Sequence, residues 1–127
     1  MIAELASIFI SLSKQEIYAY NSTGQLLYAA PISSGKTTSP TPTGEFSIGS
    51  RYERTDLIGS DYRINLPYVM CLQGASSNPE EYCIHPTPYS DIPLDQQASR
   101  GCVRTNLDTA RWLFNRAAIG TPVTIIK

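Results

Sequence analysis

The chain has 127 residues, enough for one compact domain and too few for two ordinary ones. Hydrophobic residues make up 42% and charged residues 17%, which is typical of a folded globular protein and excludes an intrinsically disordered chain. The net charge is −1 and no run of basic residues occurs, so binding to nucleic acid is not expected. No stretch reaches the ~20 apolar residues of a membrane-spanning helix, and the N-terminus lacks the positive region of a signal peptide.

The first part of the chain predicts strands joined by turns. Eight Tyr, nine Pro and eight Gly favour strands and turns over a helical bundle. Apolar residues alternate along 8–12, and 17–20 continues the β-rich pattern before a turn at 21–24 and a returning strand at 26–28. Residues 33–44 are rich in Ser, Thr, Pro and Gly. They predict an ordered surface loop, because strand signals resume directly after them.

The middle of the chain predicts two strands between longer loops. Residues 49–65 are polar with scattered Tyr and Ile, and predict a loop with short strand pieces. Residues 67–72 and 82–85 predict two strands joined by a polar connection. Three prolines and few apolar residues make 86–98 a loop, which leads the chain towards Cys102.

One convincing helix follows, over 106–119. Thr105 or Asn106 can cap its N-terminus, and Gly120 lies just past its end. The closing residues 121–126 predict a final strand. Residues 1–127 are therefore expected to form a single, mostly β domain with one main helix near the C-terminus.

The three cysteines cannot all be joined in internal disulfides, because their number is odd. Cys71 and Cys83 lie among apolar residues of predicted strands. They could pair with each other, but we favour two buried thiols, since a domain of this size needs no disulfide. A zinc site formed by the three cysteines and His85 is disfavoured, because neither C-x-x-C nor H-x₃₋₅-H spacing is present.

Cys102 is the strongest candidate for chemistry. It follows Gly101, precedes the predicted helix, and has Arg100 and Arg104 close in sequence. Helix-terminal amides and cations stabilise a thiolate, so we expect a lowered pKa for this thiol. His85 is the one imidazole in the chain and hence the available base, although alone it would also fit a core histidine bonded to the backbone. Gly101 would let a reacting carbonyl approach closely, and nearby backbone N–H groups could bind the oxyanion.

Several short segments, spread over most of the chain, together carry a family resemblance. They are Ser-Ser-Gly-Lys at 33–36, Thr-Pro-Thr-Gly-Glu-Phe at 41–46, Ile-His at 84–85, Ser-Arg-Gly-Cys-Val-Arg at 99–104, and Gly-Thr-Pro-Val at 120–123. In this set and order the chain resembles the catalytic domain of L,D-transpeptidases, the YkuD domain, which cross-links or edits bacterial peptidoglycan. The resemblance implies a β-sandwich with one flanking α-helix, and it implies no cofactor and no metal.

Carried over residue by residue, the resemblance implies a role for each of several positions. Cys102 would be the nucleophile and His85 the general base, with the backbone carbonyl of Pro86 orienting the imidazole. The remaining implied residues shape the site or bind substrate: Gly101 and Ser99 shape it, Arg104 binds a substrate carboxylate, and Tyr68 and Met70 line the acyl-donor pocket.

Arg100 is a departure from the family pattern, which has a second His at this position. Arginine cannot act as a base near neutrality, because its pKa lies above ~12. Arg100 can still donate hydrogen bonds, favour a thiolate and change the preference for donor or acceptor. A tolerated variant that faces solvent fits equally well.

The expected reaction is L,D-transpeptidation at the cell envelope or in the periplasm. Cys102 would attack the carbonyl of diaminopimelate in a tetrapeptide stem, D-Ala would leave, and an amine would resolve the thioester. Water in place of the amine would make the chain an L,D-carboxypeptidase. The chain could instead be a non-catalytic peptidoglycan-binding domain, or a toxin delivered to a competitor's wall. The expected partners are peptidoglycan stem peptides, and the chain is expected to be a monomer.

Overall fold

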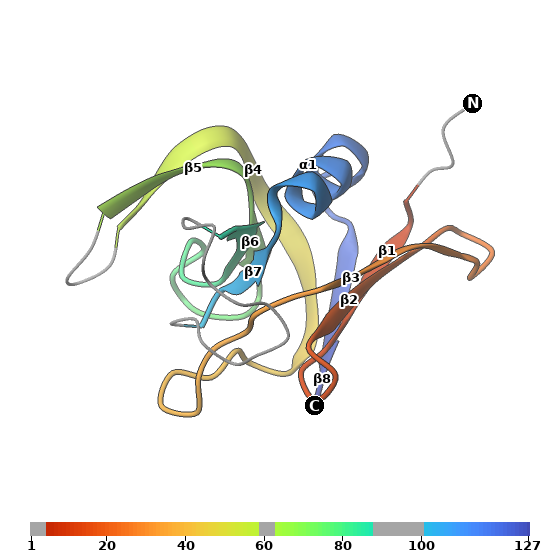
Figure 1. Cartoon of the computed structure of the whole chain (residues 1–127), viewed down its shortest axis with the longest axis horizontal. Helices are drawn as coiled ribbons and strands as arrows, with labels where there is room; N and C mark the ends of the chain where they lie inside the picture. The colour runs from red at the N-terminus through yellow and green to blue at the C-terminus, as the bar shows by residue number, and fades with distance from the viewer. Residues whose placement is uncertain (1–4, 59–62, 88–100) are drawn as a thin grey trace.

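The computed structural model describes residues 5–58, 63–87 and 101–127, and it contains a mixed sheet and one helix within these ranges (Figure 1). The elements follow in chain order: β1 (Ser7–Ser11), β2 (Glu16–Tyr20), β3 (Leu26–Pro31), β4 (Gly44–Ile58), β5 (Arg63–Gln73), β6 (Cys83–Pro86), β7 (Val103–Thr105), α1 (Leu107–Arg116) and β8 (Pro122–Ile126). The prediction of a mostly β fold with one helix near the C-terminus is confirmed. No helix of the described ranges is both long and apolar enough to cross a membrane.

The strands pair in the order β3-β2-β1-β8-β4-β5-β6-β7. The pairs β1–β8 and β6–β7 are parallel, and the others are antiparallel. β4 is fifteen residues long and pairs with β8 through its first residues and with β5 through the rest. Its ladder with β5 shifts register between Ile48 and Ser50, which is where a strand bends most easily. Figure 1 shows β4 curving from β8 towards its hairpin with β5.

The sheet closes on itself through the residues that follow β3. Ser33 forms an antiparallel bridge with Arg104 on β7, the last strand in the order. The N–H of Ser33 donates to the carbonyl of Arg104 at 2.9 Å, and the N–H of Arg104 donates back at 2.8 Å. Both edges of the bent sheet therefore meet at Ser33, and β7 has a hydrogen-bonded neighbour on each side.

Two apolar clusters lie on opposite faces of the second half of the sheet. The main core packs against α1 and contains buried residues from both halves: Leu5, Ile8, Ile10, Leu12, Ile17, Ala19, Ala30, Ile32, Ile48, Met70, Leu72, Ile84, Val103, Leu113, Phe114, Ala117, Val123 and Ile125. The second cluster consists of Leu57, Leu66, Val69, Cys71 and Cys83, with Tyr52, Ile64 and Cys102 packed against it. Burying apolar surface stabilises the fold by roughly 25 cal/mol per Å², so the larger cluster is the main source of stability.

The helix begins as predicted and ends earlier. Asn106 is its N-cap, and the side-chain oxygen accepts a hydrogen bond from the N–H of Thr109 at 2.7 Å. The helix ends at Arg116 rather than at 119. The N–H of Gly120 donates to the carbonyl of Ile48 at 2.8 Å, which draws the chain out of the helix and towards β4.

Residues 49–65, predicted as a loop with strand pieces, instead belong largely to the long hairpin of β4 and β5. The outer part of this hairpin is held by polar cross-strand contacts rather than by alternating apolar residues. Arg63 pairs with Asp56 at 3.1 Å, and the side chain of Asn65 donates to Asp56 at 2.8 Å. Leu57, Tyr52 and Ile64 do reach the second apolar cluster, but they are too widely spaced among polar residues to give a regular alternation that would reveal the strands.

Candidate active site

The described candidates for catalysis are brought together by the parallel ladder of β6 and β7. His85 pairs with Arg104 across this ladder, and Cys102 lies two residues before Arg104. Side chains alternate between the two faces of a strand, so Cys102, His85 and Arg104 project to the same face. Ile84 and Val103 point the other way and are buried in the main core. One face of the ladder thus carries the candidate catalytic side chains, and the other face packs into the main core.

His85 is buried and oriented by the backbone. Its side chain is 6% exposed, and its Nδ1 donates a hydrogen bond to the carbonyl oxygen of Pro86 at 2.7 Å. This contact leaves Nε2 as the basic nitrogen of the neutral ring. Burial lowers the pKa of His85 from its ordinary 6.5 to about 4; the hydrogen bond to Pro86 opposes this fall, and the positive charge of Arg104 adds to it. The imidazole is therefore neutral at physiological pH.

The sulfur of Cys102 is held between two backbone groups. The N–H of Cys83 donates to Sγ at 3.4 Å, and the thiol donates to the carbonyl of Glu81 at 3.7 Å. Burial raises the pKa of the Cys102 thiol, and the charge of Glu81 raises it further. The Cys83 N–H and the charge of Arg104 act in the opposite direction. The expected lowering of this pKa is wrong, because β7 separates Cys102 from α1 and the thiol packs against an apolar cluster.

A neutral thiol facing the same way as a neutral imidazole defines the resting state of the site. The raised pKa favours the neutral thiol, so a nucleophilic reaction at this sulfur would call for a base. Nε2 of His85 can accept this proton, because the ring is neutral above about pH 4 and its Nδ1 proton is tied to Pro86. The arrangement suits general-base activation of a sulfur nucleophile.

Gly101, the residue before Cys102, is fixed by the connection between β3 and β4. The hydroxyl of Thr41 donates to the carbonyl of Gly101 at 2.7 Å and accepts the N–H of Gly35 at 2.8 Å. A Cβ on Gly35 would lie 2.1 Å from the carbonyl oxygen of Ser39 and 2.9 Å from the Cα of Gly101. Gly101 itself has a φ of +123°, and a Cβ there would meet the ring of Tyr82 at 2.9 Å. Only glycine fits at both positions.

Cys71 and Cys83 form a disulfide, with sulfurs 2.10 Å apart. The interpretation as two buried thiols is wrong. The two residues are direct partners in the antiparallel ladder of β5 and β6, with Cα atoms 3.9 Å apart. This pairing depends on strand register, which the positions of the cysteines in the sequence do not give. No group of three or more candidate metal ligands occurs among the residues that the structure describes.

Tyr68 and Met70 lie on the other face of the sheet from Cys102. Met70 is 1% exposed within the main core, and the ring of Tyr68 packs 5.6 Å from that of Phe114 on α1. Cys71, next to Met70, projects towards the face of Cys102. The expected place of Tyr68 and Met70 in an acyl-donor pocket is therefore corrected: Tyr68 instead lines a pocket of about 450 Å³ beside α1. Ser99 and Arg100 fall in the range 88–100, outside the described residues.

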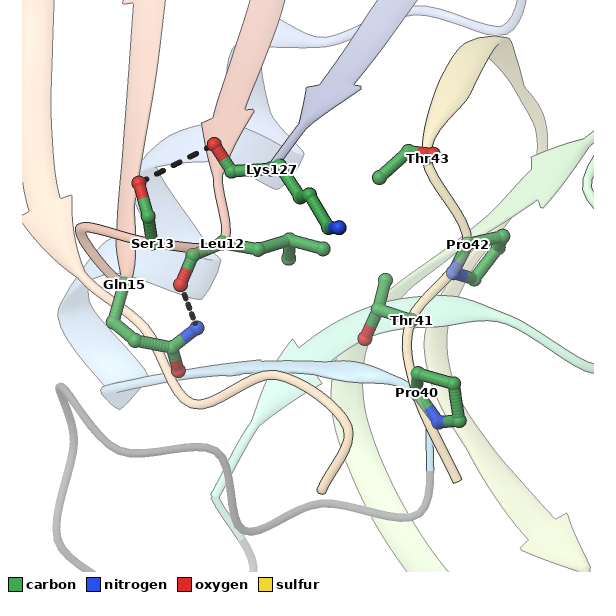
Figure 2. A pocket seen from close by; sticks show the side chains of 8 residues that line it. All are labelled: Leu12, Ser13, Gln15, Pro40, Thr41, Pro42, Thr43 and Lys127. Atoms are coloured by element: carbon green, nitrogen blue, oxygen red, sulfur yellow. Dashed lines mark hydrogen bonds between the residues drawn. The ribbon is translucent and has the colours of Figure 1, made fainter. Parts of the chain in front are cut away.

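A larger pocket of about 840 Å³ lies beside the Thr41 segment (Figure 2). Its lining comes from the β1–β2 turn, the loop before β4 and the last residue: Leu12, Ser13, Gln15, Pro40, Thr41, Pro42, Thr43 and Lys127. Figure 2 shows the side-chain amide of Gln15 donating to the carbonyl of Leu12, at 2.7 Å. The lining of the pocket includes neither Cys102 nor His85, and Thr41 links the pocket to Gly101 beside the candidate site.

Sequence reasoning did not single out Thr41, Glu81 or Cys83 as residues of the site. Thr41 was visible only as part of the segment 41–46 that resembles the family. Glu81 and Cys83 act on the Cys102 sulfur mainly through backbone groups, and a backbone group leaves no signature in residue type.

The sequence model of the L,D-transpeptidase catalytic domain, YkuD, matches residues 6–125. The chain belongs to this family. L,D-transpeptidase 1 of Mycobacterium tuberculosis is 23% identical over 134 residues, covering 95% of this chain and 51% of that protein. The probable L,D-transpeptidase 3 of the same organism is 25% identical over 107 residues, covering 75% of this chain and 37% of that protein. The chain thus spans about half, or less, of the length of these relatives.

Solved structures agree with the family assignment. A crystal structure of an L,D-transpeptidase mutant from Enterococcus faecium superimposes with a TM-score of 0.82 at 25% identity, covering 97% of this chain and 50% of that one. An L,D-transpeptidase from Mycobacterium smegmatis gives a TM-score of 0.82 at 18% identity, covering 94% of this chain and 58% of that one. The second likeness concerns the fold alone.

The buried His85 should make stability depend on pH. Between pH 6.5 and about 4 the unfolded chain protonates this imidazole and the folded chain does not. The free energy of unfolding should therefore fall as the pH decreases through this window, by about 3 kcal/mol from His85 alone. Urea denaturation across the window, compared with His85→Gln, isolates this contribution, because the variant keeps every other titrating group. Equal pH dependence in the two proteins would contradict it.

Thr41→Val should destabilise the segment that precedes Cys102. The substitution keeps the shape of the side chain and removes the hydroxyl that joins Gly35 to Gly101, which costs about 1–3 kcal/mol at a buried position. The rate at which iodoacetamide alkylates Cys102 should change as well, and Thr41→Ser should restore both quantities. Thr43→Val, two residues away and exposed, is the matched control. If Thr41→Val and Thr41→Ser behave alike, the hydroxyl has no positioning role.

Proposed function

We propose that the chain catalyses acyl transfer through a thioester on Cys102, as a peptidoglycan L,D-transpeptidase acting on tetrapeptide stems. The observation that carries the proposal is the placement of His85 and Cys102 on one face of adjacent parallel strands, with Nδ1 of His85 bonded to Pro86. Membership of the L,D-transpeptidase family supports the same reaction class. Because this substrate is part of the cell wall, the proposed reaction takes place at the cell envelope.

In the proposed first half-reaction, Nε2 of His85 removes the thiol proton while Sγ of Cys102 attacks the carbonyl between diaminopimelate and D-Ala. Backbone N–H groups around Cys102 stabilise the oxyanion. The imidazolium of His85 then returns its proton to the nitrogen of D-Ala, and the carbon–nitrogen bond breaks. The product is a thioester between Cys102 and the shortened stem, together with D-Ala.

In the second half-reaction, His85 acts as base for the acceptor. An amine of another stem attacks the thioester, the carbon–sulfur bond breaks, and the thiol of Cys102 is restored. The large fall in the pKa of His85 matters here, because the ring must be neutral again before each step in which it accepts a proton. If water is the acceptor, the same intermediate yields a trimmed tripeptide.

Arg104 is the proposed anchor for a carboxylate of the substrate. It lies on the same face as Cys102, is half-buried, and pairs with His85 across the ladder. A guanidinium presents several N–H donors in a planar fork that matches a carboxylate. The α-carboxylate of the departing D-Ala is the anion nearest to the bond that is cleaved.

Replacing Cys102 or His85 should abolish or strongly reduce turnover of tetrapeptide muropeptides. Cys102→Ala should form neither cross-linked dimer nor tripeptide, and His85→Ala should be slower by about 10²–10⁴-fold, the usual contribution of a general base. Mass spectrometry of the products measures both losses and separates transfer to an amine from hydrolysis. Ser22→Ala, on an exposed turn, should match the parent chain. Undiminished product from Cys102→Ala would rule out the mechanism.

Arg104→Gln should weaken binding of the stem more than it slows the chemistry. Loss of one charge-assisted contact predicts a rise in KM of about tenfold or more, with partial recovery in Arg104→Lys. A substrate whose terminal D-Ala is amidated provides the test. The parent chain and Arg104→Gln should differ little on it, and an undiminished difference on the amide would exclude carboxylate recognition by Arg104.

A further inference from the structure

The three cysteines form one row, with Cys71 on β5, Cys83 on β6 and Cys102 directly before β7. Cys71 on β5 is the direct partner of Cys83 on β6. Ile84 pairs with Val103 across the parallel ladder, which places Cys102 beside Cys83. The N–H of Cys83 also donates to Sγ of Cys102 at 3.4 Å. All three residues belong to or pack against the second apolar cluster, so they share one face with Cys83 in the middle.

Strand spacing decides which pairs in this row can form a disulfide. Neighbouring strands lie roughly 4.8 Å apart, within the Cα separation that a disulfide tolerates. Cys83 can therefore bond to either neighbour. Cys71 and Cys102 are two strands apart, roughly 9 Å, which exceeds the limit of about 7 Å without backbone movement. Any exchange between the outer cysteines must pass through Cys83.

The three cysteines differ in how accessible they are to small molecules in solution. Cys71 is 0% exposed and Cys83 is 1% exposed, whereas Cys102 is half-buried. A small-molecule disulfide in solution therefore reaches Cys102 before it reaches the other two. Its product would be a mixed disulfide on the residue that the proposed function needs as a thiol.

We propose that Cys83 is a resolving cysteine for Cys102, and that the row passes a disulfide inward from Cys102 to the pair of Cys71 and Cys83. In the reduced chain, a small-molecule disulfide first forms a mixed disulfide on Cys102 and releases one small thiol. The Cys83 thiolate then attacks Sγ of Cys102; the Cys83–Cys102 bond forms, and the second small thiol leaves. Cys71 next attacks Sγ of Cys83, the Cys71–Cys83 bond forms, and Cys102 departs as a thiolate that takes up a proton.

The balance is one external disulfide reduced to two small thiols, and two protein thiols oxidised to the Cys71–Cys83 disulfide. Cys102 ends as it began. The last step runs in this direction because Cys71 approaches Cys83 from the side opposite to Cys102. The leaving sulfur of Cys102 belongs to the less buried residue, and the Cys83 N–H and the charge of Arg104 partly offset the effect of burial on its thiolate. A Cys71 thiolate would be fully buried. The disulfide seen in the structure is the end point.

The exchange itself depends only on the three sulfurs. The benefit of the exchange is that it returns Cys102 to the thiol form, and this benefit rests on the proposed function. The test therefore reads thiol states and not turnover. The full chain is reduced, freed of reductant and mixed with oxidised glutathione; samples are quenched with N-ethylmaleimide, and the disulfides are mapped by mass spectrometry over time.

Each cysteine variant should block the exchange sequence at a different step. The parent chain should acquire the Cys71–Cys83 disulfide and recover an alkylatable Cys102. Cys71→Ser should accumulate the Cys83–Cys102 disulfide. Cys83→Ser should keep glutathione on Cys102 and form no Cys71–Cys102 bond. Cys102→Ala should form the Cys71–Cys83 disulfide at least about tenfold more slowly, because oxidised glutathione must reach two buried sulfurs directly.

Two results would overturn the proposal. One is formation of the Cys71–Cys83 disulfide in Cys102→Ala as fast as in the parent chain. The other is lasting glutathione on Cys102 in Cys71→Ser, with no Cys83–Cys102 bond. The comparison of Cys102→Ala with the parent chain is repeated in concentrated urea, which unfolds the strands. If the folded arrangement of the cysteines causes the rate difference, the two proteins should then form the Cys71–Cys83 disulfide at the same rate. Muropeptide turnover, measured separately, reports on the proposed function alone.

Discussion

The parallel pairing of β6 with β7 is the contact on which the candidate active site depends. The two strands have four and three residues, and so short a parallel ladder is weak by itself. It is held from both sides. β5 and the disulfide fix β6, and the backbone bonds of Ser33 fix β7. The relative position of His85 and Cys102 is therefore a property of the whole closed sheet rather than of the two short strands.

Burial favours a neutral thiol and a neutral imidazole at this site rather than a preformed thiolate. Both Cys102 and His85 resist charge because burial, nearly complete for His85 and partial for Cys102, removes water that would solvate the charged form. Arg104 lowers the pKa of each, so it favours an ionised sulfur and disfavours an ionised imidazole. In a thiolate–imidazolium pair these two influences oppose each other. The arginine is thus better suited to holding an anion than to creating a permanent ion pair.

The sequence predicted the parts of the structure that depend on local patterns. Alternating apolar residues and turn signals located β1 to β3, the two capping candidates Thr105 and Asn106 located the start of α1, and the short segments that include the run around Cys102 pointed to the family. The features that the sequence could not predict depend on the register between strands and on which face of the sheet a side chain occupies. The outer part of the β4–β5 hairpin has polar pairs such as Asp56 with Arg63, which leave no periodic signal. The disulfide and the buried side of Met70 follow from which residue lies opposite which, and that is decided only when the strands pair.

The position of β8 in the middle of the sheet affects how the protein folds during its synthesis. β8 is the last strand in sequence, yet it lies between β1 and β4 and joins the two halves of the sheet. A chain emerging from the ribosome can form the β1–β2–β3 meander and the β4–β5 hairpin, but it has no strand to unite them until β8 has been made. Such non-local pairing slows folding. It also means that a chain without β8 lacks the frame that brings Cys102 to the same face as His85.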